Sequence, residues 1–286
     1  MTLEDRTSSV NVRSGVSGRL SGYSGRLSAL AARWLPPLLI VVGVLGAWEG
    51  YVHIFDVQKW LLPAPSVIAV TIVDDVGLLS RHALVTLEEV LVGFALALAT
   101  GVVVAAGIAL SRTAERAIYP FVIASQTIPI IAIAPLLLVW VGYGLAPKII
   151  VVALIAFFPI VVNTVDGMKS ADPDVVNLMR TLGASRWQIF LKLQAPWSMP
   201  FLFSGTKIAI TVCVIGAVIG EWVGSSEGLG YLMIRSKPQF LTERVFAAIA
   251  ILSAIGVGLF VLVGVVEKLA IPWWHGERRL RAFGEK

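Results

Sequence analysis

Long uninterrupted apolar runs constrain this chain more than any other feature of its sequence. A helix needs about 20 mainly apolar residues to cross the hydrocarbon core of a bilayer, and runs of this kind recur along the chain. Hydrophobic residues make up 57% of the chain and charged residues only 14%, which is far from the composition of a soluble domain. We therefore expect an all-α integral membrane protein. We predict six membrane-spanning helices, at residues 34–55, 85–110, 118–141, 147–165, 201–223 and 245–266.

The two ends of the chain differ from this apolar body. Residues 1–33 are rich in Ser, Gly and Arg, so we expect a disordered basic N-terminus, followed by a helix that starts at Pro36 and Pro37. The segment lacks the apolar core and cleavage site of a signal peptide. Its arginines suit anionic membrane lipid better than nucleic acid. Residues 34–266 form the expected transmembrane domain, and residues 267–286 form a second basic tail.

Lys and Arg are unevenly distributed between the loops. Six spans place both termini on one side of the membrane, and that side carries most of the positive residues. The positive-inside rule therefore predicts that both termini, together with the loop between the fourth and fifth spans, are cytoplasmic. The net charge of +5 follows from this topology and does not indicate a nucleic-acid partner.

The loop between the fourth and fifth spans contains a polar segment at residues 172–200, which reads DPDVVNLMRTLGASRWQIFLKLQAPWSMP. Asp172 is a suitable N-cap residue and Pro173 suits the first helical position, so a short helix is expected to begin there. Gly183 would end this helix in the left-handed conformation.

A second helix is expected after this glycine corner. Ser185 and Gln188 have the spacing of a capping box, in which each residue satisfies the backbone of the other. Pro196 is expected to stop this helix because proline removes a backbone donor. The 172–200 segment therefore predicts a helix, a glycine corner and a second helix.

These residues resemble those of a known family. The string Arg180-Thr181-Leu182-Gly183-Ala184-Ser185, followed by Pro196, is similar to the "EAA" loop of binding-protein-dependent ABC importer permeases, in the branch that serves nitrate, sulfonates and taurine. That loop reads Glu-Ala-Ala, three residues, Gly, nine residues, Ile-x-Leu-Pro. The glycine and the final proline are present here, whereas Asn177, Leu178 and Met179 stand in place of Glu-Ala-Ala. Further matching strings extend the resemblance over most of residues 61–266.

The resemblance implies a fold, a function and partners. The fold would be that of a type I ABC importer permease, with a coupling loop at residues 168–200 and a cytoplasmic coupling helix between helices 4 and 5. The chain would form the inner-membrane pathway for a small solute, which is sulfonate-, taurine- or nitrate-like or a pyrimidine precursor. A separate cytoplasmic ATPase, an extracytoplasmic solute-binding protein and a second copy of the chain would be its partners. The residues that would contact the ATPase are Arg180, Thr181, Leu182, Gly183, Ala184, Ser185, Arg186, Trp187 and Pro196.

Several polar residues and prolines inside the apolar runs are candidates for the pathway. Prolines bend a helix and free a carbonyl group, and amide side chains can hydrogen-bond a passing solute. Simple bending and packing between helices explain the same residues equally well. The candidates are Gln126, Pro129, Pro135 and Asn163.

Three carboxylates lie near the predicted ends of spans. Glu221 precedes a glycine-rich turn at residues 224–230 and is either solvated or part of an outer gate. We interpret Glu88 and Glu89 as residues at the start of the second span, where the helix dipole favours negative charge.

The motifs that the sequence lacks argue against several possible mechanisms. The sequence has no G-x-x-x-x-G-K-[ST] phosphate loop, so ATP hydrolysis is expected in a partner chain and this chain is expected to be non-catalytic. We expect no cofactor and no metal, because no His or Cys cluster has ligand spacing and two of the three histidines, His82 and His275, fall outside the predicted spans. A stand-alone secondary transporter or channel remains the alternative. A membrane enzyme has less support, because no catalytic constellation is evident.

Overall fold

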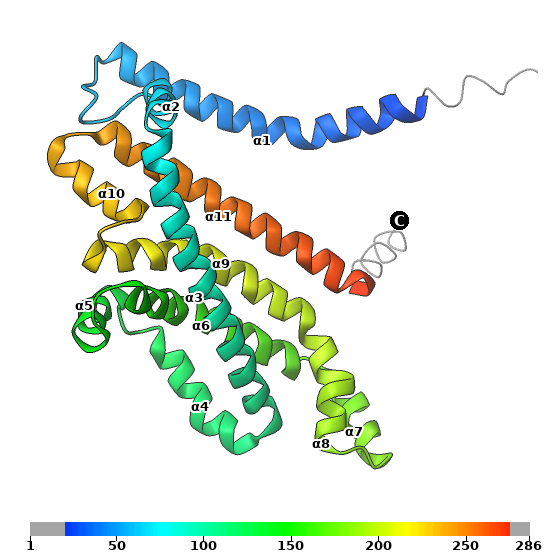
Figure 1. Ribbon diagram of the computed structural model, residues 1–286. Coiled ribbons are helices and arrows are strands. Elements are labelled where there is room, and N and C mark those ends of the chain that lie inside the picture. The colour runs from blue at the N-terminus through cyan, green and yellow to red at the C-terminus, as the bar shows by residue number, and fades with distance from the viewer. Residues whose placement is uncertain (1–20, 275–286) are drawn as a thin grey trace, which may run out of the picture. The chain divides into compact units, whose positions relative to one another are not determined.

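The computed structural model describes residues 21–274, with side chains from residue 35 onward, and every regular element in this range is a helix. This agrees with the expected all-α fold. The helices are α1 (Ser21–Ile54), α2 (Pro65–Asp74), α3 (Val76–Leu110), α4 (Arg112–Ser125), α5 (Ile130–Val141), α6 (Leu145–Lys169), α7 (Pro173–Thr181), α8 (Arg186–Ile189), α9 (Ala195–Gly224), α10 (Leu229–Ser236) and α11 (Thr242–Ala270) (Figure 1). A π-helical turn (Phe190–Gln194) joins α8 to α9, and a 3₁₀ turn (Lys237–Gln239) follows α10.

The chain divides into two compact units, residues 1–58 and 59–286. In the first unit, α1 includes residues 21–33, where we expected disorder, and continues through Pro36 and Pro37, where we expected a helix to start. Residues 27–32 are Leu, Ala and one Ser, and the strong helix propensity of Leu and Ala extends the helix toward the N-terminus. The remaining parts of the predicted basic ends, residues 1–20 and 275–286, lie outside the described residues.

Five helical segments in the described range are long and apolar enough to cross a membrane: residues 35–54 of α1, α3, α6, the continuous stretch 186–224, and α11.

The third predicted span is not one straight helix. It consists of α4 and α5, which meet at 101°. The hydroxyls of Ser125 and Thr127 each donate to a carbonyl one turn back at 2.7 Å, and Pro129 has no backbone N–H to continue the helix. The count of six spans holds if this bent pair is one of them.

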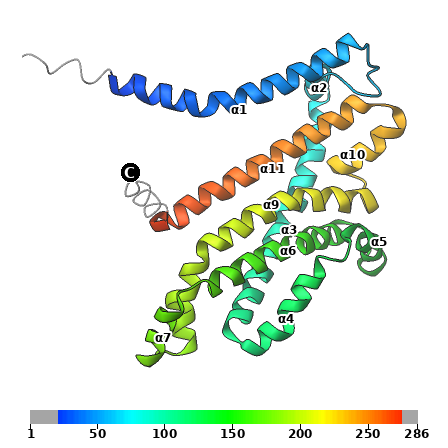
Figure 2. The ribbon, with the colours of Figure 1, turned by 180° about the vertical axis from the view of Figure 1, so that it is seen from behind.

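In the second unit, α6 packs along both α3 and α9 (Figures 1 and 2). Glycines allow this close approach, because a Cβ on Gly205 of α9 would lie 2.5 Å from the carbonyl oxygen of Pro159 on α6. On the other side, a Cβ on Gly93 of α3 would lie 2.5 Å from the Cβ of Val152 on α6. Small residues at such crossings let membrane helices gain packing contacts that lipid cannot replace.

The long helix α9 connects two ends of this unit. Helices α7 and α8 lie at its beginning, and α10 folds back from its other end (Figures 1 and 2). We refer to these as the α7–α8 end and the α10 end. An ion pair between Lys207 and Glu267 connects α11 to α9. A second ion pair connects α11 to the turn before α3, where the Nε of Arg244 lies 2.7 Å from Oδ2 of Asp75.

Candidate functional site

The 172–200 segment begins with the local structure that its sequence predicts. Asp172 is the N-cap of α7, and its carboxylate accepts a hydrogen bond from the backbone N–H of Asp174 at 2.9 Å. Pro173 is the first residue of the helix, where a missing N–H has no cost. Helix α7 then ends at Thr181. These contacts confirm the predicted start of the segment.

The glycine corner is also confirmed. Gly183 has φ of +81°, a left-handed conformation that a residue with a Cβ adopts only with strain. No atom lies within 4 Å of the position that its Cβ would take, so the backbone angle alone requires glycine there. The next residue, Ala184, donates its N–H to the carbonyl of Met179 at 2.9 Å and so closes the end of α7.

The second helix of the segment starts as predicted and ends differently. Ser185 and Gln188 form a reciprocal capping box, with contacts of 3.2 and 2.7 Å. The prediction that Pro196 stops the helix is wrong, because Pro196 is the second residue of α9. In the π-helical turn that precedes it, the N–H of Ala195 bonds to the carbonyl of Phe190, five residues back. This widened turn leads directly into α9, whose first turn has no need of the N–H that proline lacks.

Several apolar side chains of this segment are uncovered. Leu182 is 77% exposed, and Leu178 and Trp187 are also exposed. The Trp187 ring stacks on Phe190 at 5.4 Å between centroids, which holds it against the start of the π-helical turn. The 172–200 segment therefore presents an apolar, conformationally defined surface at the α7–α8 end. Uncovered apolar surface of this kind commonly marks a contact with another molecule.

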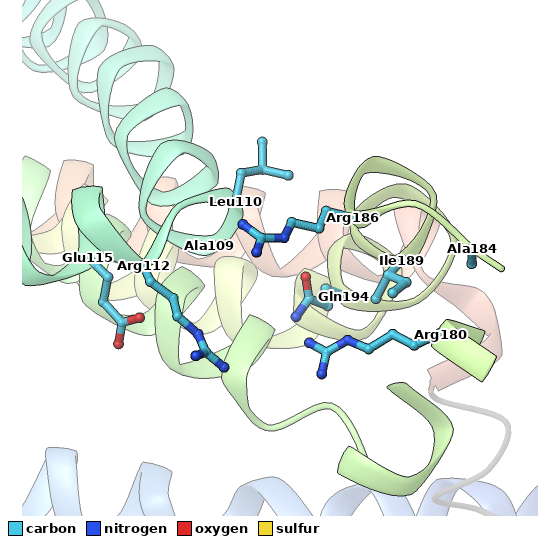
Figure 3. A pocket seen from close by; sticks show the side chains of 9 residues that line it. All are labelled: Ala109, Leu110, Arg112, Glu115, Arg180, Ala184, Arg186, Ile189 and Gln194. Carbon is cyan, nitrogen blue, oxygen red and sulfur yellow. The ribbon is translucent and has the colours of Figure 1, made fainter. Parts of the chain in front are cut away.

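A cavity of about 430 Å³ lies beside this surface. One wall comes from the end of α3 and the start of α4, including Arg112 and Glu115, and the other comes from the 172–200 segment. In Figure 3 the side chains of Arg112, Arg180, Arg186 and Gln194 extend from separate places in the chain toward the same space. Of the nine residues predicted to contact the ATPase, three line this cavity: Arg180, Ala184 and Arg186.

At the α10 end, Glu221 is 1% exposed and accepts hydrogen bonds from one side chain and two backbone N–H groups. The Thr86 hydroxyl donates to one oxygen at 2.6 Å, and the backbone N–H groups of Gly230 and Tyr231 donate to the other at 2.5 and 3.3 Å. The carboxylate thus caps α10. A Cβ on Gly228 would overlap the carboxylate, which explains why glycines follow it in the sequence.

Next to this cap lies an ion pair that sequence reasoning missed. Lys148 of α6 donates to Glu89 of α3 at 2.5 Å and to the hydroxyl of Ser225 at 2.8 Å. Glu89 is completely buried, and its second oxygen has no hydrogen-bond partner in the part of the chain that the structure describes. Our assignment of Glu89 to a helix N-terminus is wrong, because α3 begins at Val76, several turns earlier. A carboxylate inside an apolar run was the one available signal.

The same early start of α3 places His82 inside the helix, whereas we expected it outside the spans. Its Nδ1 accepts the backbone N–H of Gly228 at 2.9 Å. Thr86, one turn further along α3, accepts the N–H of Leu229 at 2.9 Å. The loop before α10 is therefore held to α3 through a row of side chains.

The pathway candidates do not form one group. Gln126 and Pro129 line a mainly apolar cavity of about 610 Å³ between α3, α4, α5, α6 and α9. Pro135 lies inside α5 on its exposed surface. Asn163 donates one side-chain N–H to the carbonyl of Pro159 at 2.7 Å, so this donor is used within α6. Glu221 lies in the cap described above.

Comparison with known proteins identifies relatives over most of the chain. The family model described as "binding-protein-dependent transport system inner membrane component" matches residues 93–271. The formylaminopyrimidine transport permease protein ThiX of Halalkalibacterium halodurans is 38% identical over 84% of this chain and 96% of its own length. The riboflavin transport system permease protein RibX of Chloroflexus aurantiacus is 36% identical over 84% and 89%. The putative aliphatic sulfonates transport permease protein SsuC of Bacillus subtilis is 27% identical over 84% and 88%.

A solved structure shares the fold. The inward-facing MetNI methionine ABC transporter contains a chain that matches 70% of this chain and 97% of its own length, with a TM-score of 0.58 and 20% sequence identity. This identity supports a statement about the fold alone. Together with the family match over residues 93–271 and the relatives above 30% identity, it agrees with the resemblance seen in the sequence. The chain is a multi-pass membrane protein that belongs to the family of binding-protein-dependent transport system inner membrane components, the permease subunits of ABC importers.

Proposed function

We propose that two copies of this chain form the translocation pathway of an ABC importer. A separate ATPase drives the pathway, and a solute-binding protein supplies the solute from the outer side. Both chain termini and the 172–200 segment lie in the cytoplasm in this arrangement, as the distribution of Lys and Arg predicts. Family membership supports the assignment to an ABC importer. The 172–200 segment supports the proposed position of the contact with the ATPase.

The exposed surface of the 172–200 segment is the observation that carries this proposal. Its backbone is fixed by a side-chain cap at Asp172, a left-handed residue at Gly183 and a capping box at Ser185, yet Leu182 and Trp187 remain uncovered. A segment with fixed local structure and exposed apolar side chains suits docking into a partner, because little conformational entropy is lost on binding. The segment continues through the π-helical turn into α9, so a displacement of the segment is passed directly to a spanning helix.

We further propose that the solute is an uncharged heterocycle of the formylaminopyrimidine type. ThiX and RibX, whose names give heterocyclic solutes, share 38% and 36% identity with this chain, whereas SsuC shares 27% over a similar length. The 610 Å³ cavity fits a small planar molecule, and its lining residues include the polar Ser125 and Gln126 but no Lys or Arg. A sulfonate or nitrate ion would lack a cationic partner there.

The test of coupling is recovery of the ATPase with the affinity-tagged permease from its native membrane. Gly183→Asp places a side chain on a left-handed backbone and a charge on the apolar docking surface. Gly142→Asp is the matched control. Gly142 also has a positive φ, at +91°, and no atom lies within 4 Å of the position that its Cβ would take. It lies at the end of α5, outside the 172–200 segment. We expect the ATPase with wild type and with the control, and its loss with Gly183→Asp.

Two results would contradict the proposal. If wild type recovers no ATPase even after crosslinking in intact membranes, a stand-alone transporter or channel is the better explanation. If Gly183→Asp recovers as much ATPase as the Gly142→Asp control, the 172–200 segment is not the docking surface. The solute is tested by uptake of labelled formylaminopyrimidine into cells expressing the complete transporter, in competition with taurine and nitrate. Absence of uptake, or uptake that taurine or nitrate abolishes, would refute the heterocyclic assignment.

A further inference from the structure

Three arginines and one carboxylate line the cavity between α4 and the 172–200 segment, which leaves an excess of positive charge there. Arg112, Arg180 and Arg186 all extend into it (Figure 3). Within the described residues, Arg112 and Arg186 have no side-chain hydrogen bond or ion pair, and Arg180 makes one long contact of 3.4 Å with the Asn177 amide. Arg112 also lies within the electrostatic reach of Glu115, but within this part of the chain the guanidinium groups of Arg112 and Arg186 keep all their hydrogen-bond donors unused and that of Arg180 keeps most of them.

One carboxylate lies on the wall of this cavity, and it is already engaged. Glu115 forms an ion pair with Lys169 of α6 at 2.7 Å. Three guanidinium groups that converge on one space repel one another, and the repulsion is relieved when an anion occupies that space. The Gln194 amide adds a neutral hydrogen-bonding group on the same side. The cavity of about 430 Å³ is large enough for a small anionic group.

We propose that this cavity is a binding site for a phosphate group, held by Arg112, Arg180 and Arg186. Each guanidinium offers several donors in a planar fork that matches phosphate oxygens in pairs. A phosphate presents three or four oxygens to several directions, whereas a carboxylate presents two in one plane, so three separate arginines fit phosphate better. The bound group bridges α4 to the 172–200 segment and so restrains the movement of the segment.

Two sources can supply this phosphate. The cavity lies where α3 ends and α4 begins, at the end of a spanning helix, and a lipid headgroup is found at that depth. The cavity is also open, so a soluble phosphate compound can enter. The two sources share the same recognition by guanidinium groups, and they differ in whether acyl chains are needed. Phosphate binding at this site does not depend on the proposed transport function, whereas the restraint on the 172–200 segment rests on it.

The experiment measures binding to the full-length protein purified in a neutral detergent, by isothermal titration at 0.15 M salt. The probes are inorganic phosphate, dioctanoyl phosphatidylglycerol and, as a zwitterionic control, dioctanoyl phosphatidylcholine. The double variant Arg112→Gln/Arg186→Gln removes two of the three guanidinium groups. Arg116→Gln is the matched control, because Arg116 is an exposed arginine of α4 that does not line the cavity.

We expect saturable binding of phosphate, of phosphatidylglycerol or of both, with a dissociation constant raised about tenfold or more in the double variant and unchanged in the control. Binding of the lipid alone assigns the site to a headgroup, and equal binding of inorganic phosphate assigns it to a soluble ligand. The proposal is overturned if neither anionic probe saturates or if the double variant binds like wild type. Loss of ATPase recovery in the double variant, without phosphate binding in wild type, would assign the cavity to a protein contact instead. Neither binding measurement requires ATPase or transport, so the site and the proposed function fail independently.

Discussion

The buried ion pair between Glu89 and Lys148 allows a quantitative test of the α10 end. The side chain of Glu89 is 0% exposed and that of Lys148 is 9% exposed. At an effective dielectric constant of about 20, two charges 2.5 Å apart attract by about 7 kcal/mol, which is comparable to the several kcal/mol needed to remove each ion from water. The intact pair therefore adds little net stability, whereas the loss of one partner leaves a buried charge without compensation.

Lys148→Met is the perturbation of choice, because methionine keeps an unbranched side chain while it removes the charge and the hydrogen bonds to Glu89 and Ser225. We expect the free energy of unfolding to fall by about 3–5 kcal/mol. Glu89→Met should cost a similar amount, because it leaves the ammonium group of Lys148 buried. The double variant should lie within about 1 kcal/mol of wild type, since replacing a buried pair with apolar residues is often neutral.

The measurement is a double-mutant cycle, with unfolding by sodium dodecyl sulfate in mixed micelles followed by far-ultraviolet circular dichroism. Arg81→Gln is the control, because Arg81 pairs with Glu227 at the surface and its side chain is 70% exposed. Its loss should cost less than about 1 kcal/mol. If the double Glu89/Lys148 variant is as unstable as the sum of the single variants, the two residues are not coupled and the argument from burial is wrong.

Three further predictions concern packing and capping. Gly205→Ala should lower the free energy of unfolding by about 1–3 kcal/mol, because its Cβ would lie 2.5 Å from a backbone oxygen of α6. Gly107→Ala should raise it by about 0.5–1 kcal/mol, because no atom lies within 4 Å of that Cβ position. The two variants must change stability in opposite directions in the same unfolding assay. Thr86→Val should cost about 1–3 kcal/mol for each group left unpaired, which are one oxygen of the Glu221 carboxylate and the backbone N–H of Leu229. An unchanged unfolding midpoint would contradict the cap. Ser185→Ala should weaken its helix start by about 1 kcal/mol, seen as faster hydrogen exchange confined to residues 186–189.

The 172–200 segment could be predicted in detail because its signals are local. A cap such as Asp172, a left-handed residue such as Gly183 and the box from Ser185 to Gln188 all depend on residues within one helical turn. Both partners of each contact are therefore visible in the same short string. Pro196 was misjudged because the π-helical turn before it changes the hydrogen-bond register, and no local residue signals that turn.

The bent third span shows a partial success. The apolar run at residues 118–141 correctly indicated a membrane segment, but hydropathy carries no information about direction. The 101° bend arises where Ser125 and Thr127 satisfy carbonyls that a continuing helix would have bonded. Such side-chain bonding competes with the helix, and packing of α4 and α5 against different parts of the unit decides the result.

The sequence by itself determined the class of the protein, its apolar spans and the local form of the 172–200 segment, because these depend on composition and on neighbours along the chain. Only the tertiary structure decided which charges are buried and what they meet. Glu89 and Lys148 are distant in sequence and pair because α3 and α6 pack closely. Likewise, Arg112 converges with Arg180 and Arg186 only because the start of α4 lies beside the segment. A side chain's partner across the fold depends on how helices pack, and that packing sums many weak contacts that no single stretch of sequence contains.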